Sequence, residues 1–205
     1  ALRVDDLLFL PAPFPAVNDY FTSITGLLNF RNSNSKLEPR RAADLVEGLT
    51  LASFGPALSY VTEGQMGAAT VPTALTVTMN TPVAADTFVA IASSDEAALT
   101  VVGGGVTIPA GQTSAQVLVN GVAPAASVTL TATYDGTMLT AAVRVLGAAE
   151  LPSTVTLTPA TANLAVGGTL TMTVTLDVPA PVAGTVVSVT LNPATAGAVP
   201  PTVVI

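Results

Sequence analysis

Apolar and polar residues alternate with a period of two over most of the chain after residue 57. The run A-L-T-V-T-M at 74–79 is the clearest case, and the residues N-T-P that follow it end the pattern. Successive side chains of a strand point to opposite faces, so this alternation predicts half-buried β-strands. The dipeptide Asp135-Gly136 favours a tight hairpin between two of them. Further strands are predicted at 58–62, 87–92, 106–108, 114–119, 128–134 and 137–146.

Turn-forming residues separate the predicted strands. The polar stretch 93–96, the glycines 103–105 and the run P-A-G-Q at 109–112 each predict a turn. Seven strands fall within about 90 residues, which is the number found in an immunoglobulin-like β-sandwich. The fold class predicted for this part of the chain is therefore all-β.

The last part of the chain repeats the first strands at a spacing of 97 residues. Val77 aligns with Val174 at this spacing, and after two one-residue gaps of opposite sense the run 106–108 meets 203–205. New strands are accordingly predicted at 154–159 and 170–176. A long period with matched strands is typical of a tandem domain array.

Residues 1–49 differ in composition from the rest of the chain. They hold 11 of the 19 charged residues, and seven of the nine aromatic residues lie at or before Tyr60. This change predicts a domain boundary near residues 48–55. Within the segment, the pattern predicts strands at 4–10, 20–30 (bent at Gly26) and 36–39, a turn at 31–35 and a helical turn at 42–46.

Two sets of residues resemble known families. The runs V-T-L-T-P-A-T-A-N-L-A-V-G-G-T-L-T-M-T-V-T-L-D-V-P-A-P (155–181) and T-I-P-A-G-Q-T-S-A (107–115) resemble bacterial Ig-like repeats of large secreted or cell-surface proteins. The run S-I-T-G-L-L-N-F-R-N-S-N-S-K-L-E-P-R-R-A-A-D-L (23–45) resembles the last hairpin of OB-like domains found beside extracellular nucleases and lamin-tail modules in bacterial secreted proteins.

These resemblances imply tandem immunoglobulin-like β-sandwiches, the second incomplete, after a short OB-like β segment. The implied division is the C-terminal part of an OB-like domain at 1–49, an Ig-like β-sandwich at 50–149 and the N-terminal part of a second one at 150–205. The implied location is extracellular or on a bacterial cell surface.

Composition narrows the possible functions. The formal net charge of -7 argues against non-specific binding of the whole chain to nucleic acid or to an anionic membrane. Neither cysteine nor histidine is present, which removes disulfides, thiolates and the commonest general base. No stretch approaches 18 consecutive apolar residues, so no membrane-spanning helix is predicted.

Two acidic pairs are candidates for a calcium site, because calcium prefers carboxylate and carbonyl oxygens gathered from loops. Asp95-Glu96 lies in a predicted turn and Asp5-Asp6 lies near a predicted strand. Neither pair belongs to a run with calcium-loop spacing, and the favoured interpretation is a solvated polar turn. We therefore expect no metal ligand and no cofactor.

A basic, aromatic segment is the one candidate for contact with nucleic acid. OB-like sheets stack bases on aromatic side chains over a basic groove. Residues 1–49 nevertheless carry six acids against five bases, so a structural hairpin with surface ion pairs is favoured and nucleic acid is not an expected partner. The segment contains the bases Arg31, Lys36, Arg40 and Arg41 and the aromatic residues Tyr20, Phe21 and Phe30.

A catalytic site is not predicted. Serine and threonine are abundant, but a nucleophile needs an activating base, and the chain has no histidine and a single lysine, Lys36. The glycines 103–105 lack the context of a phosphate-binding loop. We expect a protein that is not an enzyme, with no catalytic and no cofactor-binding residue.

The second repeat stops where the first continues with three or four further strands. One expectation is that the sequence is a window on a longer protein that supplies the missing strands. The other is that strands of a neighbouring subunit complete the sheet by β-augmentation and link molecules into a fibre. In either case the expected partner is protein.

The function expected from the sequence is a non-catalytic extracellular structural or adhesive module, such as a stalk, fibre or surface-filament segment. The alternative is an accessory region of a secreted hydrolase, most plausibly a nuclease, whose catalytic domain lies elsewhere. A carbohydrate-binding module is disfavoured, because the chain has no tryptophan and only two aromatic residues after Tyr60.

Overall fold

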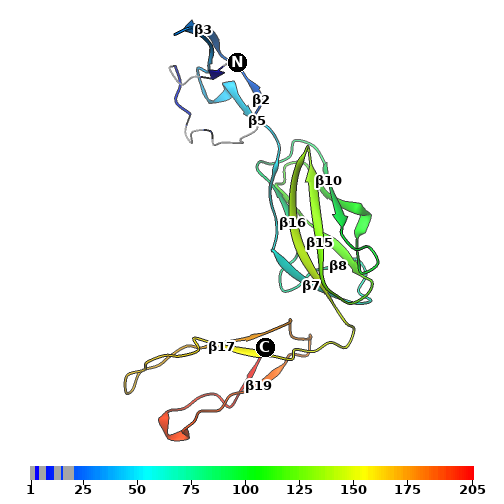
Figure 1. Ribbon diagram of the computed structural model, residues 1–205, viewed down its shortest axis with the longest axis vertical. Coiled ribbons are helices and arrows are strands. Elements are labelled where there is room, and N and C mark those ends of the chain that lie inside the picture. Colours follow the sequence, from blue (N-terminus) through cyan, green and yellow to red (C-terminus); the bar gives the residue numbers. More distant parts are fainter. Residues whose placement is uncertain (1–2, 5–7, 12–14, 16–20) are drawn as a thin grey trace.

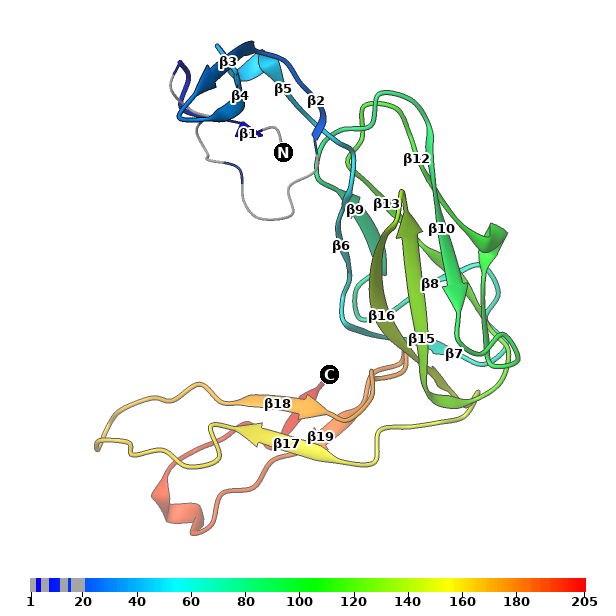
Figure 2. The same ribbon diagram turned by 45° about the horizontal axis from the view of Figure 1, so that its top comes forward.

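The computed structural model describes residues 3–4, 8–11, 15 and 21–205 of the chain. In these residues the regular structure consists of β-strands and three short 3₁₀ turns, η1 (Ala42–Asp44), η2 (Val102–Gly104) and η3 (Ala194–Ala196). The all-β prediction is confirmed. Figures 1 and 2 show the strands in three successive groups, blue to cyan, cyan to green and yellow to red, which follow one another along the long axis.

The N-terminal group contains two small sheets. One has the strand order β1-β4-β3, and the other pairs β2 with β5 in antiparallel fashion. Strand β1 is parallel to β4, and β3 and β4 form an antiparallel hairpin. The bounds are β1 (Arg3–Val4), β2 (Phe21–Ile24), β3 (Leu27–Arg31), β4 (Asn34–Glu38) and β5 (Leu45–Glu47).

The predicted strand at 20–30 is interrupted near Gly26, where a bend was expected. A Cβ atom at Gly26 would lie 2.4 Å from the carbonyl oxygen of Glu38, so only glycine allows this approach of the two backbones. The turn predicted at 31–35 is present, and Asn32 and Ser33 within it both have positive φ angles. Such angles are typical of a type I′ hairpin turn.

The strands β6 to β16 form the middle group, which we call the first module. They lie in a five-stranded sheet of order β12-β10-β15-β16-β7 and in two three-stranded sheets, β13-β9-β6 and β11-β14-β8. The bounds are β6 (Leu51–Gly55), β7 (Leu58–Thr62), β8 (Ala68–Ala69), β9 (Thr76–Met79), β10 (Thr87–Ser93), β11 (Leu99–Val101), β12 (Gly105–Ile108), β13 (Ser114–Gln116), β14 (Leu118–Gly121), β15 (Ala125–Tyr134) and β16 (Thr137–Leu146).

The start of the first module is divided between two sheets. Strand β6 pairs antiparallel with β9, and after the two residues Pro56 and Ala57 strand β7 pairs parallel with β16. The first part of the module therefore contacts both sheets, and its second strand lies beside its last one.

The first module encloses one hydrophobic core. The core side chains come from strands of both the five-stranded sheet and the three-stranded sheets, as the alternation of apolar residues predicts. Its largest fully buried members are Leu75, Met79, Leu99, Ile108, Leu130, Val61, Val77, Val83, Val89, Val117, Val119 and Val128.

The prediction of one strand at 114–119 is wrong in detail. The chain changes sheets at Val117, so that β13 pairs with β9 whereas β14 pairs with β11 and β8. The backbone N–H of Val117 donates to the carbonyl of Leu75 at 2.8 Å, and the Val117 side chain is fully buried. Sequence alternation did not predict the strands β6, β8 and β11 either.

The C-terminal group, which we call the second module, has two antiparallel strand pairs. Strand β17 (Val155–Thr158) pairs with β18 (Thr173–Leu176), and β19 (Val186–Ser188) pairs with β20 (Thr202–Val204). In the part of the chain that the structure describes, each of these two sheets has only two strands.

The two pairs of the second module reproduce two pairs of the first. Leu157 faces Val174 across β17–β18, as Phe54 faces Val77 across β6–β9. Likewise Val187 faces Val203 across β19–β20, as Val89 faces Val106 across β10–β12. The 97-residue spacing relates Val77 to Val174 and Val106 to Val203, but β17 corresponds in its pairing to β6 and not to 58–62, the strand that this spacing matches to it.

Candidate functional site

The inner face of the second module is open to solvent. Val77 and Ile108 are completely buried in the first module. At the same positions in the second module, Val174 is half-buried and Ile205 is 39% exposed. The residues that form a core in one module thus form an accessible apolar surface in the other.

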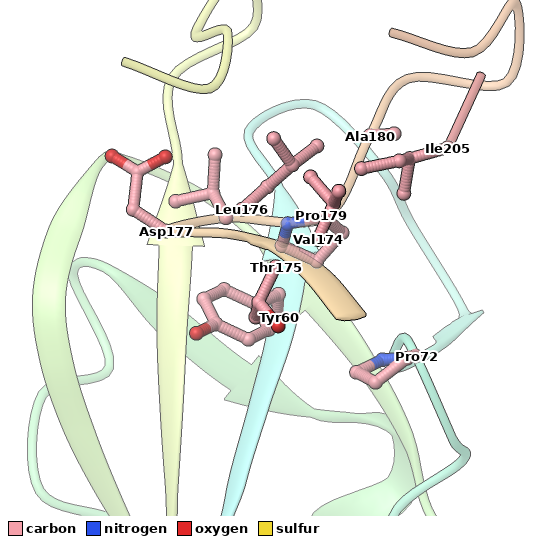
Figure 3. A pocket seen from close by; sticks show the side chains of 10 residues that line it. Tyr60, Pro72, Val174, Thr175, Leu176, Asp177, Pro179, Ala180 and Ile205 are labelled. Atoms are coloured by element: carbon pink, nitrogen blue, oxygen red, sulfur yellow. The ribbon is translucent and has the colours of Figure 1, made fainter. Parts of the chain in front are cut away.

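A cavity of about 250 Å³ lies between the two modules. Figure 3 shows Tyr60 of β7 and Pro72 on one side and the β18 segment on the other, with Ile205 at the far end. The residues that line it are Tyr60, Pro72, Val174, Thr175, Leu176, Asp177, Val178, Pro179, Ala180 and Ile205.

The second-module side of this cavity is the counterpart of a filled core. Leu176 occupies the position of Met79 in the repeat, and Met79 is only 2% exposed. In the first module the corresponding space is packed by strands such as β15, whose Leu130 is fully buried in the same core. The cavity lies between this face of β18 and the surface of the first module.

Asp177 holds the start of the second module through Ser153. Its carboxylate accepts hydrogen bonds from the Ser153 hydroxyl at 2.6 Å and from the Ser153 backbone N–H at 3.0 Å. The hydroxyl hydrogen bond is the largest cause that lowers the pKa of Asp177 from 3.8 to about 2. In Figure 3 this carboxylate points away from Tyr60.

The connection between the modules is fixed by Glu150. Its carboxylate makes an ion pair with the guanidinium of Arg144 and accepts a hydrogen bond from the Gly147 backbone N–H at 3.0 Å. The Glu150 backbone N–H also donates to the Gly147 carbonyl at 2.9 Å. A closed turn therefore joins the end of β16 to the second module.

The acidic pair Asp95-Glu96 forms a structural turn. The Asp95 carboxylate accepts a hydrogen bond from the Ala97 backbone N–H at 3.0 Å, and its carbonyl accepts from Leu99 at 2.9 Å. Within residues 3–4, 8–11, 15 and 21–205, no three acidic, histidine or cysteine side chains gather as metal ligands. The other candidate pair, Asp5-Asp6, lies outside the described residues.

The basic segment is engaged in contacts within the N-terminal group. Asp44 is 3% exposed and accepts hydrogen bonds at its carboxylate from the Arg40 backbone N–H at 2.9 Å and the Arg40 Nε at 3.1 Å. The Arg41 Nε lies 3.5 Å from the same carboxylate. The backbone hydrogen bond from Arg40 is the first cause that lowers the pKa of Asp44.

Two of the three aromatic residues of the expected base-stacking surface, Phe21 and Phe30, lie within the described residues. Phe30 is 73% exposed on β3, and Phe21 on β2 is half-buried, whereas Tyr20 lies outside the described residues. Arg40 and Arg41 both make ion pairs with the carboxylate of Asp44. The segment is arranged as a hairpin with ion pairs, as the favoured interpretation of the sequence states.

Glycines 103–105 close the short connection between β11 and β12. Gly103 and Gly104 have positive φ angles, and a Cβ atom at Gly105 would lie 2.2 Å from the carbonyl oxygen of Val89. Their role here is to allow a tight turn between strands.

No helix in the described residues is long and apolar enough to cross a membrane.

Sequence reasoning did not identify the Asp177–Ser153 contact or the cavity at Tyr60. The signal for the first was present, because Asp177 lies 97 residues after Asn80 in the repeat. The Tyr60 and Pro72 side of the cavity had no such signal, since it depends on how the second module lies against the first.

The chain has a structural similarity to a known protein but no match to a protein family. No protein-family model and no curated protein matches the chain. Among solved structures, the crystal structure of domains 4 and 5 of the S-layer protein SbsC is similar, with 20% sequence identity and a TM-score of 0.35. The similarity covers 55% of this chain and 56% of that one, so it spans only about half the length of the S-layer fragment.

Proposed function

We propose that this chain is a non-catalytic structural or adhesive segment of an extracellular, cell-surface protein. In this proposal, tandem immunoglobulin-like modules follow the end of an OB-like domain and act as a stalk, fibre or filament segment. The protein serves to hold its neighbours at a distance and in a fixed direction, and its partners are other protein modules.

The strand order of the first module supports the immunoglobulin-like assignment. Immunoglobulin-like sandwiches place strands A, B and E in one sheet and C, F and G in the other. Here β6, β9 and β13 form one sheet in the order expected for A, B and E, and β10, β15 and β16 are neighbours in the order expected for C, F and G.

The observation that carries the proposal is the shared register of the two modules. Two strand pairs recur with equivalent pairing: Phe54 faces Val77 in the first module, as Leu157 faces Val174 in the second. Repeats of one supersecondary pattern are typical of arrays in which each unit contacts its neighbours. The connection through Glu150 supports a defined junction, as a spacer requires.

The chemistry of the cavity also favours a structural role. Its walls are mainly Val, Leu, Ile, Pro and Ala side chains, and its titratable groups are Tyr60 and Asp177. General acid–base catalysis needs a group placed to exchange a proton with substrate. The Asp177 carboxylate is instead turned toward Ser153.

The alternative, an accessory region of a secreted nuclease, gains no support from the basic segment. Contact with a phosphate backbone needs cationic side chains that are free to neutralise it. Arg40 and Arg41 both lie against the Asp44 carboxylate. The ion pairs therefore compete with the contacts that this alternative needs.

Labelling of intact cells tests the proposal. Antibodies raised against the first module should label unpermeabilised producing cells, and the label should follow extended structures in electron micrographs. The chain should leave single- and double-stranded DNA, RNA and polysaccharides unchanged on prolonged incubation. Label confined to permeabilised cells, or hydrolysis by the chain itself, would contradict the proposal.

A further inference from the structure

We propose that the outer face of the five-stranded sheet in the first module packs against the same face of a second copy of this chain. This inference rests on the proposed structural function and names a partner for it. The contact joins neighbouring molecules side by side, whereas the connection through Glu150 joins successive modules of one chain.

Side chains that point away from the core on five adjacent strands form this outer face (Figure 2). Leu130 and Ala132 of β15 are fully buried, so the residues that alternate with them point outward. The register places Thr131 between Ala92 of β10 and Thr140 of β16, at the middle of the face. The outward residues are Gly105 and Thr107 of β12, Phe88, Ala90 and Ala92 of β10, Thr129, Thr131 and Thr133 of β15, Met138, Thr140, Ala142 and Arg144 of β16, and Leu58, Tyr60 and Thr62 of β7.

The outer face has almost no charge. Arg144 is the only charged residue in its five strands, and the Arg144 guanidinium makes an ion pair with Glu150. In a typical globular domain about a quarter of the residues are charged. The other charged residues between positions 50 and 149 lie in connections at the ends of strands, and they are Glu63, Asp86, Asp95, Glu96 and Asp135. Packing of two such faces therefore buries no unpaired charge.

Large apolar side chains lie at opposite ends of the outer face. Phe88 on β10 and Met138 on β16 are 52% and 66% exposed, and Leu58 on β7 is 47% exposed. The register sets Leu58 beside Ala142, which lies further along β16 than Met138. A two-fold axis in the plane of the contact, perpendicular to the strands, brings Met138 of one copy over Ala142 and Leu58 of the other. The apolar residues of the two copies then cover each other.

The threonine side chains suit a contact between identical faces. Each hydroxyl is both a donor and an acceptor of hydrogen bonds. Thr131 and Thr140 lie at the middle of the face, so a two-fold axis there brings them near their counterparts in the second copy. A contact between two identical surfaces requires this self-complementarity. A strongly basic or acidic partner would find no opposite charge on the face, so a second copy fits it better.

The area of the outer face is sufficient for a weak contact. Neighbouring strands lie about 4.8 Å apart and rise about 3.3 Å per residue, so five strands of about seven residues present roughly 500 Å². Two such faces bury about 1,000 Å², which is near the lower limit for a specific protein contact. The pair should therefore dissociate in dilute solution and persist where many copies lie side by side.

Analytical ultracentrifugation of the intact chain at rising concentration tests the contact. The chain should form dimers reversibly, and added salt should strengthen them, because salt screens the repulsion between copies that each carry a net charge of -7. Thr131→Lys and Thr131→Glu should each raise the Kd of the dimer roughly tenfold or more, since like charges then face each other. An equal mixture of the two variants should restore association, because opposite charges then face each other.

Thr78 provides the matched control. It is half-buried and points outward from β9, the central strand of the sheet β13-β9-β6, as Thr131 does from β15. Thr78→Lys and Thr78→Glu should leave the Kd of the dimer within about threefold of the parent value. Circular dichroism before sedimentation shows whether each variant keeps its strands.

Cross-linking provides a second measurement, since the chain has no cysteine of its own. A short bismaleimide should link Thr140→Cys into dimers roughly tenfold faster than it links Thr78→Cys, because the contact raises the local concentration of the second thiol. Equal rates for the two variants would contradict the contact.

Several sedimentation results would overturn the inference. These are a chain that stays monomeric up to about 1 mM, equal effects at Thr131 and Thr78, no restoration in the mixture, or association that salt weakens. Dimers that Thr131→Lys leaves unchanged would place the contact on another surface. Surface labelling of cells is independent of these measurements, so a monomeric chain leaves the proposed function standing, and label confined to permeabilised cells does not explain a lack of association.

Discussion

Asn80 and Asp177 hold the ends of equivalent strands in the two modules. The backbone N–H of Asn80 donates to Thr50 at 3.0 Å, and that of Asp177 donates to Thr154 at 3.3 Å. In both modules the side-chain Oδ1 accepts a hydrogen bond from the backbone that enters the module, from Thr50 at 2.9 Å and from Ser153 at 3.0 Å. The same local hydrogen bond is therefore accepted by an amide oxygen in the first module and by a carboxylate oxygen in the second.

The carboxylate version should make the second module sensitive to acid. Because the folded state holds the pKa of Asp177 near 2 rather than 3.8, the unfolded state binds a proton first as the pH falls. The stabilisation from Asp177 is therefore complete above pH 4 and is lost as the pH falls toward about 2. Thermal unfolding between these values, with NMR of the Ser153 amide, measures this loss.

Asp177→Asn is the matched control, since it reproduces the amide found at Asn80. The variant keeps an oxygen acceptor for the Ser153 backbone but does not titrate in this range. The difference in unfolding temperature between the parent and the variant should therefore change with pH. A difference that stays constant from pH 5 to pH 2 would contradict the role assigned to Asp177.

Ile108 and Ile205 occupy equivalent positions and should differ in their contribution to stability. Ile108 is fully buried, whereas Ile205 is 39% exposed. Ile108→Ala should lower the free energy of unfolding by about 2 to 5 kcal/mol, because it removes buried methyl groups and leaves a cavity. Ile205→Ala should cost less than about 1 kcal/mol. Urea unfolding followed by circular dichroism compares them, and equal losses would contradict the open face.

Gly121 should not tolerate a side chain. A Cβ atom at this position would lie 2.4 Å from the carbonyl oxygen of Thr62, which belongs to a strand and cannot move freely. Gly121→Ala should lower the free energy of unfolding by about 1 to 3 kcal/mol. Gly147→Ala is the control, since its nearest neighbours lie 3.9 Å away, and it should change stability by no more than about 0.5 kcal/mol.

Ser59 should be replaceable with a gain in stability. Its side chain is fully buried on β7, and its Oγ has no hydrogen-bond partner among the described residues. Ser59→Ala removes this unsatisfied group and should raise the free energy of unfolding by about 1 kcal/mol.

Ser94→Ala provides the opposite case, because the Ser94 Oγ accepts a hydrogen bond from the Thr129 backbone N–H at 3.0 Å. It should lower the free energy of unfolding by about 1 kcal/mol. A loss of stability in both serine variants, measured in the same urea series, would indicate that Ser59 has a partner after all.

The local features of the fold could be predicted from local residues. Asp135-Gly136 forms the turn between β15 and β16, with φ angles of 43° and 80°, because only residues that accept positive φ fit a type I′ turn. The alignment of Val77 with Val174 and of 106–108 with 203–205 could also be predicted, whereas the match of 154–159 with 58–62 was wrong, because β17 pairs as β6 does. These predictions depend on interactions within a strand or between neighbours in the chain.

Other features depend on contacts that alternation does not encode. The change of sheet at Val117 leaves the apolar–polar pattern uninterrupted, because the side chain stays buried while the backbone exchanges one partner strand for another. Strands as short as β8, with two residues, have no period to detect. At the candidate site, Tyr60 and residues of the second module line one cavity. Their proximity depends on how the connection at Glu150 places the two modules, and the residue pattern along the chain does not describe that placement.

The parallel pairing of β7 with β16 has a mechanical consequence. These strands lie near the two ends of the first module and are matched over five residue pairs, from Leu58 with Ala142 to Thr62 with Leu146. When the chain is pulled at its ends, one strand is drawn along the other, so the bonds between them are loaded together in shear. A pull at the Asp135-Gly136 turn would instead peel the sheet one pair at a time. The first module should therefore resist a pull at its two ends more strongly than a pull at the Asp135-Gly136 turn.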